Sequence, residues 1–555
     1  MKKFYFLKSK LLLTGFIFLT LISFSSLQSQ TYAPLGSGAN GTTVRAVIVY
    51  NGELIIAGDF TSVGGVSCNG IAKWNGSGWA PLGFGVTGGS ANALAVLGSD
   101  LYVAGAFTNA GGSTANRIAK WNGSTWSTLG LGLNSTAEAL TVHNNALYVG
   151  GSFTTAGGIT VNGIAAWSGS AWSGLGAGTN GTVSAIASYN NELYIGGSFT
   201  SVGGVPVGRI ARWNGSNWNT AGSGVETGSN VYALHQLGNN LIVGGLFTNI
   251  GGVGVNNIAS WNGTSYSSLA SGLTGGSVRA LTSYLGELYA GGFFTTAVGG
   301  PTVNRITKWN GSSFTALGTG CNADVRALGT FDATLILGGA FTGAGPVVAS
   351  HIAKWGSIPV APVLSSPSNA ATNVNLTPLL EWNAVNNAFD YTVQLTNDPN
   401  FNSTLINQSG ITEAEYQVPG GTLMVNNVYF WRVNARNGMG TGPYSSIFFF
   451  STNATGIVNI STEVPERYGL YNNYPNPFNP TTKIKFDIPS SGLNSNVNLV
   501  VFDASGRLVS TLVNSQLNPG SYEFEFTATN LTSGVYFYRL TTDNFVDTKK
   551  MILVK

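Results

Sequence analysis

The chain has 555 residues, which is too many for one ordinary hydrophobic core, so several domains are expected. Charged residues make up only 8% and hydrophobic residues 43%, with 77 glycines. This composition excludes a disordered chain and favours many short strands joined by tight turns. The formal net charge is only +3, whereas nucleic-acid binding needs a concentrated basic surface, so we predict no nucleic-acid partner.

The first thirty residues have the layout of a secretory signal peptide. Four lysines precede the apolar run 11–24, and small and polar residues follow it. We predict cleavage between Ser26 and Thr31, which leaves 21 basic and 22 acidic groups, a net charge of −1. A membrane-spanning helix is the alternative, but the run is short for about 30 Å of hydrocarbon. We therefore expect no transmembrane anchor after signal removal.

A repeated phrase dominates residues 31–357. It reads approximately V-x-A-L, then L-Y-V-G-G-x-F-T, a Gly-Gly turn, I-A-x-W-N-G-S-x-W and L-G-x-G. Seven copies recur at spacings of 46 to 48 residues, as shown by Phe60, Phe107, Phe153, Phe199, Phe247, Phe294 and Phe341. Each copy holds four short strand-like runs and no helical period, which predicts one blade of a β-propeller per copy. The Asn-Gly pairs predict two-residue hairpin turns between the third and fourth strands.

The seventh copy stops after its third strand, at HIAKWGSIPV. Only six copies have a fourth strand, beginning at Trp79, Trp126, Trp172, Trp218, Tyr266 and Phe314. The segment TYAPLGSG from Thr31 aligns with WAPLGFG from Trp79. We therefore predict that the mature N-terminus supplies the missing outer strand, which closes the ring and removes an open sheet edge.

The Gly-Gly pair followed by two aromatic residues resembles the kelch repeat, as at Gly150-Gly151, Trp167 and Trp172. The likeness covers all seven repeats, although Trp replaces the usual Tyr and the two aromatics stand closer together than in the family. Kelch-like propellers bind proteins, carbohydrates or actin, and a few are enzymes. The resemblance therefore implies the fold and leaves the function open.

A Pro-rich stretch near Ser357 marks a domain boundary. Residues 358–453 contain alternating strands around Trp382, Tyr391 and Trp431, with Leu423 six residues before Tyr429. This pattern resembles a fibronectin type III module with its tyrosine corner, which implies a spacer or a minor binding surface. We expect a linker over residues 454–471.

Residues 472–555 carry four motifs in order: NNYPNPFNPTTKIKFDIP, VVFDASGRLVSTL, LTSGVYFYRL and TKKMILVK. Together they resemble the type A sorting domain of the type IX secretion system of Bacteroidetes, which implies a small β-sandwich that an outer-membrane translocon reads. The prolines keep the first stretch from pairing as a central strand, and Gly506 and Gly534 fit turns. The predicted motif residues are Pro475, Asn476, Pro477, Phe478, Asn479, Pro480, Gly506, Gly534, Tyr536 and Lys549.

Candidate catalytic groups are sparse. His143, His235 and His351 lie at different places in different repeats, so we predict no metal site, no cofactor and no copper centre. Most propeller carboxylates are predicted to be solvated loop groups. Asp59 and Asp324, in the first and last repeats, are the one pair that could face each other as a glycosidase requires, although solvated loop carboxylates are the favoured interpretation of this pair too.

Two further features have competing interpretations. Cys68 and Cys321 could bond across the ring closure, but a chain this long does not depend on one disulfide. Lys73, Lys120, Arg212, Lys308 and Lys354 occupy the x of I-A-x-W, either as a girdle for anionic polysaccharide or as ordinary solvated positions. The repeated tryptophans are predicted to pack between sheets.

The sequence therefore predicts an all-β protein, with a seven-bladed propeller closed by the N-terminal strand and two β-sandwich domains behind it. We expect an extracellular or surface binding or adhesion protein that engages glycan or protein and is exported by the type IX translocon. A secreted carbohydrate-active hydrolase or lyase is the alternative, and a purely structural role is a third.

Overall fold

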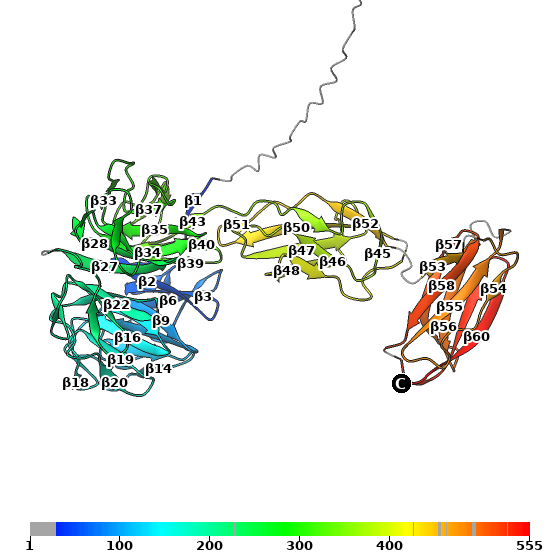
Figure 1. Cartoon of the computed structure of the whole chain (residues 1–555), viewed down its shortest axis with the longest axis horizontal. Helices are drawn as coiled ribbons and strands as arrows, with labels where there is room; N and C mark the ends of the chain where they lie inside the picture. Colours follow the sequence, from blue (N-terminus) through cyan, green and yellow to red (C-terminus); the bar gives the residue numbers. More distant parts are fainter. Residues whose placement is uncertain are drawn as a thin grey trace, which may run out of the picture.

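The computed structural model describes residues 29–226, 229–425, 427–452, 457–461, 463–490, 495–529 and 531–555. Of the predicted signal peptide, residues 1–30, only residues 29 and 30 are among the described residues. Every named element in the described part is a β-strand. Figure 1 shows three β bodies that follow one another along the chain, the first of which spans the repeats.

Seven four-stranded antiparallel sheets make up the first body, one for each repeat, and we number them 1 to 7 in the order of their innermost strands. The innermost strands are β2 (Thr43–Tyr50), β9 (Ala91–Leu97), β15 (Ala137–His143), β21 (Val183–Tyr189), β27 (Asn230–Leu237), β34 (Val278–Tyr284) and β39 (Val325–Phe331). The second strands are β3 (Glu53–Asp59), β10 (Asp100–Gly105), β16 (Ala146–Gly151), β22 (Glu192–Gly197), β28 (Asn240–Leu246), β35 (Glu287–Gly292) and β40 (Thr334–Gly339).

The third strands carry the I-A-x-W motif. Six outer strands begin at the second aromatic residue, and β1 begins one residue before Tyr32. The third strands are β6 (Ile71–Trp74), β13 (Ile118–Trp121), β19 (Ile164–Trp167), β25 (Ile210–Trp213), β31 (Ile258–Trp261), β37 (Ile306–Trp309) and β43 (Ile352–Gly356). The outer strands are β7 (Trp79–Pro81), β14 (Trp126–Thr128), β20 (Trp172–Gly174), β26 (Trp218–Thr220), β32 (Tyr266–Ser268), β38 (Phe314–Ala316) and β1 (Thr31–Pro34).

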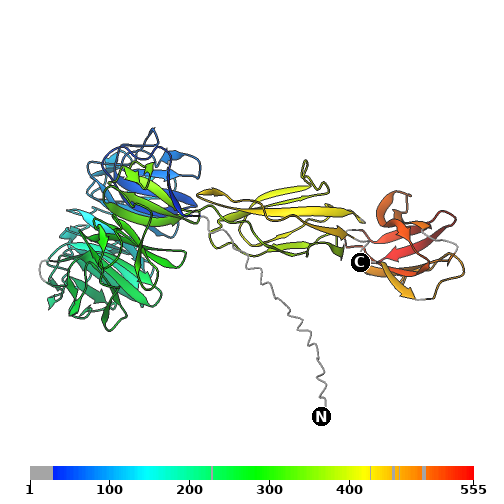
Figure 2. The same cartoon turned by 90° about the horizontal axis from the view of Figure 1, so that it is seen from above.

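The innermost strands form a closed series of neighbours. Each contacts the next in chain order, from β2 through β9, β15, β21, β27 and β34 to β39, and β39 contacts β2. In Figure 2 the blue first sheet and the green last sheet lie side by side. The seven sheets therefore surround a common axis, along which the innermost strands run.

Sheet 7 combines strands from distant parts of the chain. Its order is β1-β43-β40-β39, and β1 pairs antiparallel with β43 so that Tyr32 lies opposite Trp355. In sheet 1 the corresponding partners are Trp79 and Trp74. Tyr32 therefore occupies the register position of Trp79, as the alignment of TYAPLG with WAPLG requires.

The first aromatic residue of each outer strand joins its sheet to the preceding one. Trp126, for example, donates its indole N–H to the Leu82 carbonyl of sheet 1 at 2.8 Å, and Tyr32 donates its hydroxyl to the Leu317 carbonyl of sheet 6 at 2.9 Å. Trp79, Trp172, Trp218 and Tyr266 make equivalent bonds. Phe314 occupies the same position in sheet 6, but its side chain has no hydrogen-bond donor. The bond made by Tyr32 extends this pattern across the junction of the two chain ends.

The second body contains two sheets packed around buried aromatic residues. One sheet comprises β44 (Leu364–Ser366), β46 (Leu379–Trp382) and β49 (Glu415–Gln417). The other comprises β45 (Ala371–Val374), β47 (Asp390–Thr396), β48 (Ile406–Ile411), β50 (Val428–Asn437), β51 (Gly440–Thr441) and β52 (Phe448–Thr452). Trp431 is fully buried, and the Tyr429 hydroxyl accepts the Met424 N–H at 2.7 Å. The arrangement uses the predicted tyrosine to fix a neighbouring loop.

The third body is a sandwich of two four-stranded sheets around one apolar core. One sheet contains β53 (Ile457–Ser461), β54 (Gly469–Leu470), β55 (Thr481–Ile488) and β58 (Gly520–Thr527). The other contains β56 (Ser495–Asp503), β57 (Leu508–Leu517), β59 (Gly534–Thr541) and β60 (Val546–Leu553). The predicted linker 454–471 was therefore wrong in part, because β53 and β54 pair within this sandwich and Leu470 is buried in its core.

The second body docks against one end of sheet 7. The Lys354 ammonium donates to the Gly438 carbonyl, and the Gly438 N–H donates to the Asp332 carbonyl at 2.7 Å. Asp332 lies in the turn between β39 and β40. The innermost strands begin at one face of the ring, and this turn lies at the opposite face. The second body therefore leaves uncovered the face at which the innermost strands begin.

Candidate functional site

A β-bulge near the start of every innermost strand builds the site. In each pairing with the second strand the register skips one residue, the x of V-x-A-L, as between Val44 and Ala46 in sheet 1. The same skip occurs in the other six sheets. A bulge leaves the extra residue unpaired and turns its side chain away from the regular alternation. These seven side chains therefore point to the axis of the ring.

The second glycine of each Gly-Gly or Ala-Gly pair accommodates the bulge. A Cβ at Gly151 would lie 2.2 Å from the Thr136 carbonyl oxygen, just ahead of the bulge of sheet 3. The corresponding glycines of the other sheets would bring a Cβ to 2.0 to 2.1 Å from the equivalent carbonyl oxygen, at Gly58, Gly105, Gly197, Gly245, Gly292 and Gly339. Only glycine leaves room for so close a backbone approach. The second glycine of each pair is therefore needed for the bulge that forms the site as well as for the fold.

The bulged residues differ from sheet to sheet. They are Arg45, Asn92, Glu138, Ser184, Tyr232, Arg279 and Arg326, in sheets 1 to 7. With Thr182 they line a cavity of about 270 Å³ at the end of the channel where the innermost strands begin. We call this cavity the channel mouth. All seven side chains are only half-buried, so a ligand can reach them.

Three arginines from consecutive sheets form one side of the channel mouth. Arg45 donates from Nε to Asp59 Oδ2 at 2.8 Å, and Arg326 donates from Nε to Asp324 Oδ2 at 2.7 Å. The Arg279 guanidinium lies 4.5 Å from the centre of the Tyr232 ring, and its Nε is 3.9 Å from Asp324 Oδ2. These contacts fix the planes of the guanidinium groups and leave other N–H groups for a ligand.

The opposite side of the mouth carries acceptors and hydroxyl groups. Asn92 donates to Glu138 Oε2 and to the Ala137 carbonyl, both at 3.1 Å. Burial raises the pKa of the Glu138 carboxyl, while Arg45 and Asn92 act in the opposite direction. Ser184 and Thr182 complete this wall. The site therefore offers guanidinium donors on one wall and a carboxyl, an amide and hydroxyls on the other.

Deeper in the channel the lining becomes apolar. The residue after each bulge is alanine, from Ala46 to Ala327, and the next is Val, Leu or Ile, from Val47 to Leu328. Polar groups are therefore concentrated at the mouth, where the bulges turn them inward.

The two predicted partner carboxylates, Asp59 and Asp324, do belong to this region. Each accepts a hydrogen bond from an arginine, and Asp324 is almost fully buried. The structure therefore uses them to hold guanidinium groups. Glu138, which the sequence interpretation counted among the solvated loop carboxylates, lines the mouth instead.

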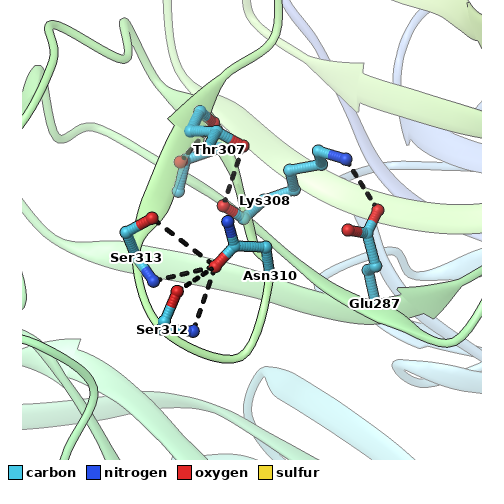
Figure 3. A network of polar contacts seen from close by, with 7 residues as sticks. Glu287, Thr307, Lys308, Asn310, Ser312 and Ser313 are labelled. Carbon is cyan, nitrogen blue, oxygen red and sulfur yellow. Dashed lines mark hydrogen bonds and ion pairs between the residues drawn. The ribbon is translucent and has the colours of Figure 1, made fainter. Parts of the chain in front are cut away.

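Neighbouring acids neutralise four of the five residues of the predicted basic girdle, whereas Lys354 donates to the Gly438 carbonyl. Lys308 donates to Glu287 at 2.8 Å across the second and third strands of sheet 6, as Figure 3 shows. Equivalent pairs are Lys73 with Glu53, Lys120 with Asp100 and Arg212 with Glu192. The interpretation of these acids as solvated loop groups was wrong, because strand register places each one beside a cation. These pairs present no excess of positive charge.

The Asn-Gly turns also differ from the expectation. Four residues separate Trp309 from Phe314, and Asn310 accepts the backbone N–H groups of Ser312 and Ser313 through Oδ1 at 3.0 and 2.8 Å (Figure 3). Gly311 has a φ of +96°, whereas Asn310 is not in the left-handed region. A side-chain acceptor therefore stabilises this turn, and the predicted two-residue hairpin was wrong.

The three histidines and two cysteines are not grouped into a common site. His143 contacts Ser188 and Asn144, His235 contacts Ser283, and His351 is buried at a left-handed position with a φ of +67°. Within the described residues no three His, Cys, Asp or Glu side chains gather as a metal site would require. Cys68 and Cys321 are buried free thiols in separate core clusters, so the structure contains no bond between them.

The predicted sorting residues divide into two groups in the third body. Pro475, Asn476, Pro477 and Lys549 line a groove with Asn472, Asn473, Tyr474, Thr548 and Lys550, of about 660 Å³. Asn476 accepts the Ile552 N–H at 3.0 Å, which holds the proline segment beside the last strand.

The other sorting residues are structural in their contacts. Phe478 and Tyr536 are buried in the core, the Pro480 carbonyl accepts the Ala528 N–H at 2.8 Å, and Asn479 directly follows Phe478. Gly506 has a φ of +82° in the turn held by Asp503, as predicted for a turn glycine. Gly534 instead begins β59 and pairs with Leu553, so its predicted place in a turn was wrong.

The sequence interpretation missed the three arginines, Asn92, Ser184 and Tyr232. The signal that could have found them is the contrast within V-x-A-L, where x changes between repeats while its neighbours stay small or apolar. A varying residue inside a strongly repeated pattern marks a position that packing does not dictate.

Comparison with known families supports the sorting domain and the β-propeller. Residues 472–555 match the family described as a secretion system C-terminal sorting domain. Residues 51–78 and 190–216 match the β-propeller family described as a domain of unknown function, DUF5122. The comparison with curated proteins gave no match.

Weak likenesses to solved structures were also found. The structure of PorZ, described as an essential surface component of the type IX secretion system of Porphyromonas gingivalis, is 13% identical, with 93% of this chain and 74% of that chain covered and a TM-score of 0.26. Chicken CNTN1 FN1-FN3 is 13% identical, over 40% of this chain and 74% of that chain, with a TM-score of 0.16. Streptomyces avermitilis α-L-rhamnosidase is 14% identical, over 34% and 24%, with a TM-score of 0.14. TM-scores this low carry no functional conclusion.

The chain is thus a secreted β-propeller protein whose sorting domain directs it through the type IX system to the cell surface or the extracellular space. The described part of the chain contains no helix with the length and hydrophobicity of a membrane span.

Proposed function

We propose that this protein is an exported binding protein that engages an extracellular glycan at the channel mouth. Its scaffold is a kelch-like, seven-bladed propeller over residues 31–357, closed by the N-terminal strand β1. Residues 358–453 serve as a fibronectin type III-like spacer. Residues 472–555 engage the translocon, and the groove that contains Pro475, Pro477 and Lys549 is the contact surface that we favour for it.

The observation that carries the proposed binding role is the ring of seven bulged residues at the mouth. The repeat could place the same side chain in every sheet, yet it places donors on one wall and acceptors and hydroxyls on the other. Sugar hydroxyls both donate and accept, so they complement such a mixed lining.

A glycan suits the mouth better than a protein segment does. Protein interfaces concentrate their binding energy in aromatic or aliphatic anchors that fill apolar pockets. Among the described residues that line the mouth, Tyr232 has the only aromatic ring, and the Arg279 guanidinium already lies over it. The mouth also lies at the end of the channel away from the docked second body, so a glycan chain has an open approach.

No specific observation favours the enzyme alternative. A glycosidase uses two carboxyl groups that face each other across the scissile bond. Asp59 and Asp324 are each bound to an arginine, which leaves Glu138 as the one carboxyl at the mouth without an arginine hydrogen bond among the described residues. This arrangement supports recognition in preference to hydrolysis.

A glycan array together with a polysaccharide-degradation screen tests the proposal. We expect binding without release of sugar, and we expect Ser184→Trp to abolish binding because the indole fills the mouth. Ser216→Trp is the matched control, since Ser216 belongs to the same repeat but is exposed in the turn between β25 and β26. Sugar release, or glycan binding that Ser184→Trp leaves intact, would contradict the proposed function.

A further inference from the structure

We propose that the channel mouth is specific for a saccharide that carries a single carboxylate, a sugar acid. This inference rests on the proposed function and adds the chemical class of the ligand. Nothing in the repeat itself requires charge at the bulge positions, because Asn, Ser and Tyr occupy the same place in other sheets.

The three arginines are arranged for a planar anion. They come from the consecutive sheets 6, 7 and 1, so their guanidinium groups lie on one side of the ring. Asp59 holds Arg45, Asp324 holds Arg326, and the Tyr232 ring supports Arg279. Planar guanidinium groups that are fixed in advance match the two oxygens of a carboxylate and lose little entropy when they bind.

The charge at the mouth favours an anion with one charge. Arg45, Arg279 and Arg326 supply three positive charges, and Asp59 and Asp324 compensate for two of them. One positive charge remains on the arginine side, and the Glu138 carboxyl lies on the other side. A doubly charged phosphate or a densely sulfated chain would place excess negative charge close to Asp324 and Glu138, whereas a single carboxylate would not.

The opposite wall supplies partners for the hydroxyls of the same sugar. Asn92 Oδ1 is buried and has no hydrogen-bond partner among the described residues, and an unpaired buried acceptor is costly. A sugar hydroxyl that donates to it would remove this cost. Ser184, Thr182 and Glu138 add donors and acceptors beside it, and a cavity of about 270 Å³ accommodates one sugar residue.

The test compares oligosaccharides that differ only in the charged group. Oligomers of galacturonate, glucuronate and mannuronate are titrated calorimetrically against the full chain, each beside its methyl ester and a sulfated neutral oligomer of equal length. We expect at least one acid to bind about tenfold or more tightly than its ester, because hydrogen bonds to a charged group are stronger.

A charge variant locates the effect. Arg279→Gln should lower the affinity for the acid and thereby remove most of the preference for the acid over its ester. Arg212→Gln is the control, because Arg212 pairs with Glu192 away from the mouth and its loss should leave the preference intact.

The outcomes separate this inference from the proposed function. Equal binding of acid and ester, tighter binding of the sulfated oligomer, or a preference that survives Arg279→Gln would overturn the sugar-acid assignment. In each of these cases the proposed function stands if Ser184→Trp still abolishes binding. If no saccharide binds in a way that Ser184→Trp blocks, both proposals fail.

Discussion

Glu138 is the acidic side chain of the channel mouth, and the fold disfavours its charged form. Burial raises its carboxyl pKa above the ordinary value of 4.5, and the effects of Arg45 and Asn92 do not cancel that shift. A raised carboxyl pKa means that the folded state holds the proton more tightly than the unfolded chain. The contribution of Glu138 to the free energy of unfolding is therefore fully present below pH 4.5. It is lost as the pH rises through the pKa that Glu138 has in the folded protein.

We therefore expect Glu138→Gln to raise the melting temperature at pH 7, because a neutral amide avoids the cost of burying a carboxylate charge, and to have little effect at pH 4. Thermal unfolding at the two pH values measures this difference. Glu53→Gln is the control, since Glu53 forms a partly exposed pair with Lys73 and its loss should lower stability slightly. A Glu138→Gln variant that is less stable than the wild type at pH 7 would contradict the assignment.

At the scale of the strands, the glycine pairs explain how neighbouring sheets approach each other. A Cβ at Gly150 would lie 2.5 Å from Val183 Cγ1 in the next sheet. Four other sheets repeat this contact, at Gly196 with Val231, Gly244 with Val278, Gly291 with Val325 and Gly338 with Val44. The two remaining interfaces have alanine at both positions, Ala57 with Ala91 and Ala104 with Ala137. Glycine therefore faces the larger valine, whereas alanine faces the smaller alanine.

This compensation predicts a coupled pair of substitutions. Gly150→Ala alone should destabilise the protein by about 1–3 kcal/mol because it overpacks the interface with Val183. In combination with Val183→Ala, it should cost less than the sum of the two single substitutions, by about 1 kcal/mol in a double-mutant cycle measured by denaturant unfolding.

The adjacent glycine provides the control for this cycle. A Cβ at Gly151 would meet the Thr136 carbonyl oxygen at 2.2 Å, and that oxygen belongs to the backbone. Val183→Ala should therefore give no rescue of Gly151→Ala. Additive effects at Gly150, or equal rescue at Gly151, would be inconsistent with the proposed packing.

The repeat pattern was sufficient to predict the strands of each sheet and the position of Tyr32 opposite Trp355, because apolar alternation and turn residues are visible in the sequence. It was insufficient for the channel mouth. A bulge arises from backbone register, and its cause, the carbonyl that approaches Gly151, becomes visible only when two strands are paired. The pairing of Lys308 with Glu287 was missed for the same reason, since 21 residues separate them.

At the scale of the whole molecule, we expect the integrity of the ring to depend on strand β1, which is far in the sequence from the rest of its sheet. Tyr32 and Leu35 are buried, and the Tyr32 ring lies 4.5 Å from that of Trp355. Recombinant protein that begins at Ala39 should therefore melt on the order of 10 °C below protein that begins at Thr31, because two large apolar side chains lose their burial.

Calorimetry of the propeller transition measures that loss. Removal of residues 457–555 is the control, because the third body has its own core and should melt separately. An unchanged propeller transition in the protein that begins at Ala39 would show that the first strand does not support the ring.

The sorting domain directs the export of the protein. It forms a sandwich with its own core, and its match to the secretion family covers residues 472–555 alone, so export and the proposed ligand site belong to separate parts of the chain. Deletion of residues 472–555 should therefore leave a folded propeller in the periplasm, as measured by cell fractionation and immunoblotting. Deletion of residues 358–453 should preserve export, since the sorting sandwich remains intact. Undiminished surface or medium levels without residues 472–555 would mean that the propeller carries an export signal of its own.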